Sequence, residues 1–185
     1  HVASVDVVDV MGGSLDGSFE VLEELGMMRV RNGDLLAQVG AGSIGQLQVM
    51  GMPSAAAVPE EGGNIEGNVS TSDGDATAVI VRYGSVNGQL NIAGHLQTLY
   101  VINGNITAAV TAQSAGSVIV RNGSMIVPDG EQVLNVTDGD ADRVVVLNGN
   151  VSGGISVDGD VMQMAVIGGD ADVDLDARSV SRLLV

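Results

Sequence analysis

The chain has 185 residues and a formal net charge of −16 at pH 7, because 23 acidic residues outnumber seven basic ones, all of them arginine. A chain this acidic repels nucleic acid and anionic membranes, and we expect neither as a partner. The chain contains no cysteine, which excludes disulfides and thiolate chemistry, and it has no apolar run long enough for insertion into a membrane.

The core must be built from small apolar residues, since only 2% of the residues are aromatic and glycine occurs 27 times. Side chains such as valine, leucine and alanine suit a narrow interior. Frequent glycines allow the chain to turn often.

Residues 1–26 alternate between apolar and polar positions, which predicts short strands. Residues 20–25 would also suit one helical turn, although a turn of that length is not stable alone. Residues 28–33 read Met-Arg-Val-Arg-Asn-Gly. This order predicts a strand with Met28 and Val30 on the inside and both arginines outside.

Leu47 and Val49 repeat this inward pair further along the chain. The alternation of apolar and polar residues is absent between residues 52 and 63, which include two prolines, three consecutive alanines and a pair of glycines. Because proline cannot donate to an interior strand ladder, we predict a loop excursion at residues 52–63.

Residues 78–169 contain one short phrase that occurs five times and always ends on glycine. The phrases are Val79–Gly84, Leu99–Gly104, Val118–Gly123, Val144–Gly149 and Met164–Gly169. Three of the four steps between closing glycines are close to a period of about 20 residues, and the step from Gly123 to Gly149 is longer. A phrase that recurs at this period indicates a repeat architecture.

The first and third residues of every phrase are apolar, as in Val79 and Val81. A period of two, ended by Asn-Gly or Gly-Gly, is typical of a strand that runs into a tight turn. A second glycine follows further apolar positions in some repeats, at Gly94 and Gly159. Each repeat therefore holds at least two strands and leaves no room for a helix.

The sequence thus predicts an all-β fold: a single-chain parallel β-helix (β-solenoid) with coils of about 20 residues, in one domain over residues 1–185. A β-barrel or β-sandwich also has short strands at this spacing, but neither predicts that a whole phrase recurs. Equivalent strands would pair in parallel, and their inward valines would stack in one column. These valines are Val81, Val101, Val120, Val146 and Val166.

The longer step between Gly123 and Gly149 predicts an insertion around residues 126–142 that adds a turn and a further strand. Leu183 and Val185 extend the inward column at the end of the sequence. Neither end shows a polar terminal repeat. We therefore expect the solenoid ends either to pair with neighbouring copies or to continue in a longer solenoid.

The outward positions of the repeated strand are polar early in the chain, at Arg29, Arg31 and Arg82, and mostly apolar later. A continuous apolar stripe on the outside of a sheet is unusual in a monomer. We predict a contact surface for other copies, unless the 52–63 loop or the 126–142 insertion folds over it. The predicted interface residues are Ile80, Tyr100, Ile102, Ile119, Val145, Leu147 and Ile167.

Aspartates crowd the last part of the chain. Several carboxylate oxygens together are what Ca²⁺ prefers, so Ca²⁺ is the one cofactor that the sequence suggests. The candidate ligands are Asp138, Asp140, Asp158, Asp160, Asp170 and Asp172. The alternative is that these aspartates are solvated carboxylates of turns and outer strand faces.

Catalytic groups are scarce, because the chain has no lysine and its only histidines are His1 and His95. We expect no enzyme activity. However, parallel β-helices also carry polysaccharide lyases and hydrolases, which use clustered carboxylates. The alternative function is therefore a carbohydrate-binding or polysaccharide-cleaving β-helix that uses the aspartates between residues 138 and 176.

Alternating Gly-Asn-Val and Gly-Asp-Val phrases fill the stretch Gly149-Asn-Val-Ser-Gly-Gly-Ile-Ser-Val-Asp-Gly-Asp-Val161. In rhythm, over roughly the last hundred residues, they resemble the solenoid cores of bactofilins and bacterial surface adhesins. The resemblance implies polymerisation or surface display. We predict a non-enzymatic structural protein, a self-assembling subunit of an extracellular filament or cell-surface layer. An opening on apolar strand residues, without a signal peptide, favours a processed, secreted chain.

Overall fold

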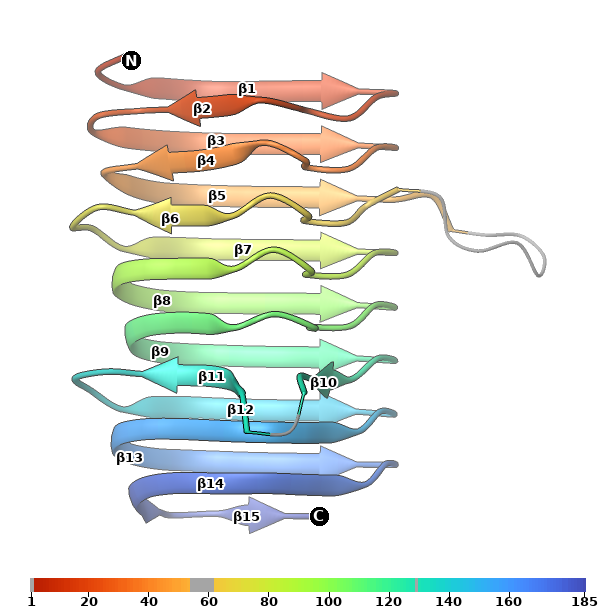
Figure 1. Cartoon of the computed structure of the whole chain (residues 1–185), viewed down its shortest axis with the longest axis vertical. Helices are drawn as coiled ribbons and strands as arrows, with labels where there is room; N and C mark the ends of the chain where they lie inside the picture. The colour runs from red at the N-terminus through yellow and green to blue at the C-terminus, as the bar shows by residue number, and fades with distance from the viewer. Residues whose placement is uncertain (1, 54–61, 129) are drawn as a thin grey trace.

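The computed structural model describes residues 2–53, 62–128 and 130–185, and every regular element in these ranges is a β-strand. The strands wind into a solenoid of about nine turns, with coils about 20 residues apart (Figure 1). The predicted all-β parallel β-helix is confirmed. The strands are β1 (Val5–Met11), β2 (Ser18–Glu20), β3 (Glu24–Arg31), β4 (Gln38–Ala41), β5 (Ser43–Met50), β6 (Val69–Thr71), β7 (Ala76–Arg82), β8 (Leu90–Ile102), β9 (Val110–Arg121), β10 (Met125–Ile126), β11 (Gln132–Val136), β12 (Ala141–Leu147), β13 (Val151–Ile167), β14 (Ala171–Val180) and β15 (Leu183–Leu184).

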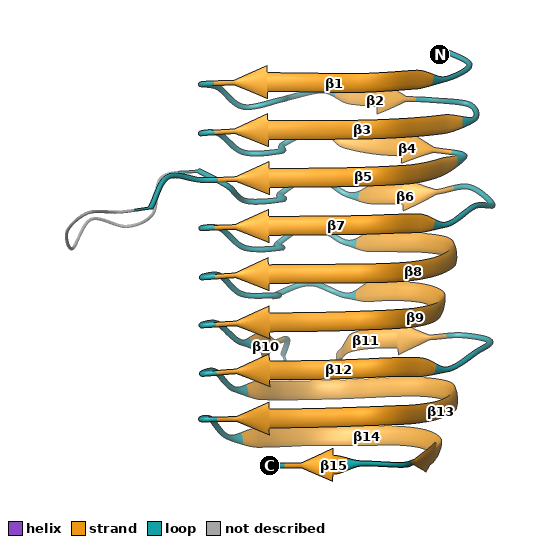
Figure 2. Ribbon diagram, turned by 180° about the vertical axis from the view of Figure 1, so that it is seen from behind, coloured by secondary structure: helices purple, strands orange, loops and turns teal. Residues whose placement is uncertain are grey.

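Each coil contributes to two layers. The main layer is a parallel sheet of β1, β3, β5, β7, the second halves of β8 and β9, β12, the second half of β13, and β15 (Figure 2). The opposite layer is in front in Figure 1 and contains β2, β4, β6, the first halves of β8 and β9, β11, the first half of β13, and β14. Single parallel bridges also join the coils between the end of a main-layer strand and the opposite-layer strand that follows it, in a column of Leu15, Leu35, Ile65, Val86, Ile106 and Met125. Met125 belongs to β10, which pairs with the start of β13.

The predicted breaks at Gly94 and Gly159 are bends inside continuous strands. β8 and β13 pass from the opposite layer into the main layer with a register shift, between Ile92 and His95 in one and between Val157 and Asp160 in the other. A bulge of this kind lets the backbone turn a corner while it keeps its ladder on both sides.

The alternative of a helical turn at residues 20–25 is wrong. β2 ends at Glu20 and β3 begins at Glu24, so this segment is a corner between two strands. The side chain of Leu25 is fully buried in the core. Burial of this leucine between the layers outweighs the weak local preference for a helix.

A column of stacked valines lines the inside of the main layer. The five predicted valines lie on adjacent rungs of one sheet, as the sequence indicated. Val49, Val30 and Val10 continue the column on the earlier coils. The members from Val30 onward are at most 1% exposed. Side chains of equal size can stack at the spacing of about 4.8 Å between strands without gaps or clashes.

Two steps in the ladder are longer than one regular coil. Leu47 pairs with Val79, so the step that contains the predicted loop at residues 52–63 is longer than one regular coil. Gly63 itself lies in the coil, since its backbone N–H donates to the carbonyl of Gly33 at 3.0 Å. Residues 54–61 of that predicted loop lie outside the described residues. Val118 pairs with Val144, and the chain between these two rungs accommodates the predicted insertion.

The corner after most main-layer strands contains a residue with a left-handed backbone; Gly51, after β5, is the exception. Asparagine fills this position on several coils, with φ of 54° at Asn103, 53° at Asn122 and 56° at Asn148. Asparagine adopts this region more readily than most residues. The amides also stack, since Nδ2 of Asn122 donates to Oδ1 of Asn103 and Nδ2 of Asn148 donates to Oδ1 of Asn122, both at 2.9 Å.

A second ladder of hydrogen bonds lies two residues after the left-handed corner position, for example at Asn105 after Asn103. Each side-chain oxygen accepts a hydrogen bond from the backbone N–H of the equivalent residue on the next coil, at 2.8 to 3.0 Å in every step. The ladder consists of Ser14, Asp34, Asn64, Ser85, Asn105, Ser124, Asn150 and Asp170. These bonds satisfy backbone donors at a corner where the sheet ladder is interrupted.

We expect Tyr83→Asn to raise the free energy of unfolding by about 1 kcal/mol. Tyr83 occupies the left-handed corner position with φ of 55°, next to Asn103. Asparagine there relieves backbone strain and provides an acceptor for the Asn103 amide. Urea denaturation followed by circular dichroism measures the change. Tyr100→Asn, within a strand, serves as the control and should give no gain, and an unchanged or lower value for Tyr83→Asn would contradict the account of the corner.

Candidate functional site

All seven predicted interface residues lie on the outer surface of the main layer. They occupy two outward positions that flank the valine column, and each position repeats from coil to coil. We call the whole set of these positions the outer stripe. Its first column is Asp9, Arg29, Gln48, Ile80, Tyr100, Ile119, Val145, Ala165 and Leu184, and its second is Met11, Arg31, Met50, Arg82, Ile102, Arg121, Leu147 and Ile167.

Large apolar side chains on the outer stripe contact one another along the solenoid axis. Among the seven predicted interface residues, the exposed fraction ranges from 9% at Val145, between neighbours on both sides, to 46% at Ile167. No described segment crosses in front of this layer in Figure 2. The stripe is thus accessible within the described part of the chain.

The insertion contacts the opposite layer instead of covering the stripe. The backbone N–H of Val127 donates to the carbonyl of Ser152 at 3.2 Å, and the N–H of Gly154 donates to the carbonyl of Glu131 at 2.8 Å. For its described residues, the alternative that residues 126–142 fold over the stripe is therefore wrong.

The outer stripe is positively charged although the chain is strongly acidic. Its two columns include four arginines and one aspartate, a net charge of +3 (4 minus 1) against −16 for the chain. Asp9 forms ion pairs with Arg31 at 2.7 Å and with Arg29 at 3.8 Å. Among the described residues, Arg82 and Arg121 form no ion pair with a carboxylate. Arginine, tyrosine and methionine with few acidic residues are typical of protein interfaces.

The insertion also forms a cleft of about 300 Å³ over the opposite layer. Gly153 and Gly154 line its floor, and a side chain at Gly153 would collide with Val127. Three carboxylates, from Asp172, Asp174 and Asp176, line one wall. Sequence reasoning missed this cleft, and the Gly-Gly pair opposite the insertion is the signal that marks it.

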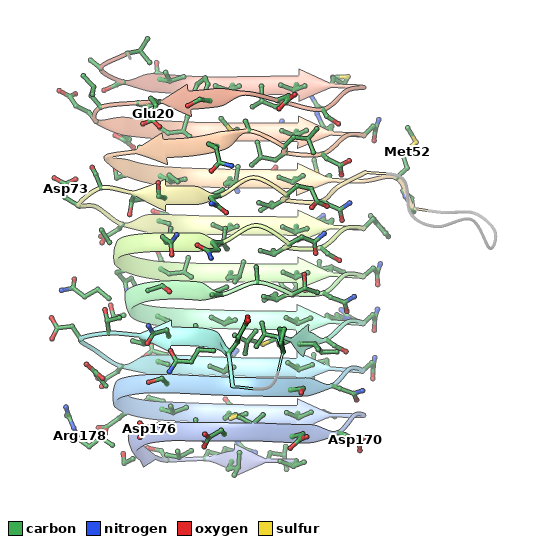
Figure 3. All side chains as sticks on the ribbon, viewed as in Figure 1. Glu20, Met52, Asp73, Asp170, Asp176 and Arg178 are labelled. Atoms are coloured by element: carbon green, nitrogen blue, oxygen red, sulfur yellow. The ribbon has the colours of Figure 1, made fainter. Side chains whose placement is uncertain are left out.

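The six candidate calcium ligands lie at different corners of the coil. Asp138, Asp140, Asp158 and Asp160 lie where the opposite layer passes into the main layer, and there Oδ1 of Asp140 accepts the backbone N–H of Asp160 at 2.8 Å. Asp170 lies at the far corner and Asp172 lies near the start of the strand after it; Figure 3 shows Asp170 and Asp176 on opposite sides of the coil. No group of three metal-ligating side chains occurs in the residues that the structure describes. Calcium binding stays a prediction.

His95 is hydrogen-bonded at the same corner as the first group of aspartates. Its ring Nδ1 lies 2.7 Å from Oγ of Ser114, and its backbone N–H donates to Oδ1 of Asp75 at 2.7 Å. Within the described part of the chain, the Asp75 carboxylate accepts a hydrogen bond from the backbone N–H of His95 and none from its imidazole ring. The arrangement lacks the carboxylate-to-imidazole contact that orients the base of a serine triad.

Comparison with protein-family models, curated proteins and solved structures finds no match for this chain. None of the described segments is a helix of the length and apolar character that spans a membrane. An assignment of function therefore depends on the outer surfaces of the solenoid.

Proposed function

We propose that the protein is a non-enzymatic structural subunit that assembles with copies of itself through the outer stripe, in an extracellular filament or a cell-surface layer. The observation that carries the proposal is the run of large apolar side chains on successive coils, on a flat sheet that no described segment covers. Such a surface gains free energy when it is removed from water.

The area of the main layer is sufficient for a stable contact. Eight strand spacings of about 4.8 Å and strands of about seven residues at about 3.3 Å each give a surface of about 38 by about 23 Å, or about 900 Å². A typical specific interface buries about 800 Å² on each partner. The cell-surface location is part of the proposal and follows the resemblance to surface solenoids. End-to-end pairing of coils stays a prediction that the lateral contact does not require.

Ile102→Ser combined with Leu147→Ser is expected to raise the concentration needed for assembly at least about tenfold, because both are large side chains of the apolar part of the stripe. Sedimentation velocity over a concentration series measures this shift. Both residues point out of the sheet, so circular dichroism should be unchanged. Leu22→Ser, at an exposed corner outside the stripe, is the control and should assemble like the wild type. Equal assembly of the double variant and the control would contradict the proposal.

A carbohydrate-binding or polysaccharide-cleaving protein is the second candidate, favoured by the cleft beside Asp172, Asp174 and Asp176. Assays of polysaccharide binding and of chain shortening distinguish the two functions. A monomer that binds or shortens a polysaccharide, and loses this property on Asp174→Asn, would favour the second candidate.

A further inference from the structure

The charges on the two outer surfaces of the solenoid are matched coil by coil. We count as one coil an opposite-layer segment together with the main-layer strand that follows it. The exposed acidic residues of the opposite-layer strands, and of the segments that lead into β2, β6 and β11, are Asp16, Glu20, Glu66, Glu131, Asp172, Asp174 and Asp176. The arginines on the outer surface of the main layer are Arg29, Arg31, Arg82, Arg121, Arg143 and Arg182. The same layer also carries exposed aspartates, at Asp6 and Asp9 on β1 and at Asp142 beside Arg143 on β12.

Coils that carry acidic residues on one surface carry arginine on the other. Asp16 and Glu20 precede β3 with Arg29 and Arg31. Glu66 precedes β7 with Arg82, and Glu131 precedes β12 with Arg143. The three aspartates of β14 precede Arg182.

The coils that end in β5, β8 and β13 complete the correspondence, because between their corners they have neither an acidic residue nor an arginine on these outer surfaces. Arg121 on β9 is the one arginine of this set without an acidic residue on its own coil. Along the solenoid axis, the coils with acidic residues on the opposite layer are therefore, with the exception of the β9 coil, the coils with arginine on the main layer.

These opposite charges cannot pair within one molecule. Two sheets packed face to face are about 10 Å apart, and the outward side chains point away from each other. Among the described residues, the only ion pairs on the main layer are those of Asp9 with Arg29 and Arg31. Carboxylates of the opposite layer can therefore pair with arginines of the main layer only when the two layers belong to different molecules.

We infer that the partner on the outer stripe is the opposite layer of a second copy, stacked in register so that equivalent coils lie at the same height. This inference rests on the proposed function and specifies its geometry. In-register stacking brings carboxylates to arginines on four coils, whereas stripe-on-stripe contact would bring together two surfaces of net charge +3 (4 minus 1 on each). Because the two surfaces in contact are different, each added copy offers a fresh surface and growth is open-ended.

The decisive variants exchange one charge pair on a single coil. Glu66 and Arg82 lie on opposite surfaces of the same coil, so in-register stacking brings Glu66 of one copy to Arg82 of the next. Glu66→Arg and Arg82→Glu alone should each raise the concentration needed for assembly about tenfold, since each creates a like-charge contact. The double variant E66R/R82E should return to within about threefold of the wild type.

D73R/R82E is the matched control, because it has the same net charge but places the new arginine at the exposed turn before β7, outside both surfaces. It should assemble as poorly as Arg82→Glu alone. Sedimentation velocity measures assembly, and circular dichroism checks that each variant is folded.

Each result bears on a different part of the account. If the wild type assembles and Glu66→Arg assembles equally well, or if E66R/R82E is no better than D73R/R82E, the in-register stack is wrong while the proposed function stands. A wild type that stays monomeric at every concentration overturns the proposed function and this inference together.

Discussion

Gly123→Ala is expected to lower the free energy of unfolding by at least about 3 kcal/mol, or to prevent folding. Gly123 belongs to a column of glycines that lie one above another at the corner of the coils. A methyl group built on Gly123 would overlap the carbonyl oxygen of Gly104 on the coil before it. Gly84, Gly149 and Gly169 have the same relation to the coil before them. Relief of the overlap requires adjacent coils to separate, which weakens the ladder on both layers.

The first member of this column supplies the control. A methyl group on Gly13 would meet no atom within 4 Å, and its φ is not in the left-handed region. Gly13→Ala should change stability by less than about 1 kcal/mol. Urea denaturation below the concentration of assembly compares the two variants, and equal midpoints would show that the glycines are not needed for close stacking.

Leu99→Ala should lower the free energy of unfolding by about 3 kcal/mol. Leu99 is fully buried and lies between Val79 and Val118 in the inner column beside the valines. Its truncation leaves a cavity that the neighbouring rungs cannot fill, because the backbone ladders hold them at a fixed spacing.

Leu36, on the opposite layer, is 40% exposed and provides the comparison. Leu36→Ala should cost less than about 1 kcal/mol, since little apolar area is lost. Denaturation curves for the two variants test the difference. A cost at Leu99 no larger than the cost at Leu36 would contradict the assignment of the inner column.

The repeated main-layer strand could be predicted because its signal is local. Each phrase puts valine at the same place before a closing glycine, and period two then fixes which side chains face inward. The register between β5 and β7, across the step that contains residues 52–63, followed from Leu47 and Val49 for the same reason. The residues between and beside these inward valines must face outward, so the positions of the outer stripe from Ile80 to Ile167 could be predicted as well.

The corners and the insertion could not be predicted from such a signal. Whether Gly94 and Gly159 end a strand or bend it depends on the neighbouring coil, which holds the ladder on both sides of the bulge. The insertion could fold toward either layer until its contacts with Ser152 and Gly154 were known. Likewise, the relation between Glu66 and Arg82 required the structure, because it depends on which opposite-layer segment shares a coil with which strand.

Sedimentation velocity of the wild-type protein over a concentration series tests self-assembly through the outer stripe most directly. The account predicts species larger than the 18.7 kDa chain that grow with concentration and shrink as added salt screens the arginine-carboxylate contacts. A sole 18.7 kDa species at every concentration and salt would contradict it.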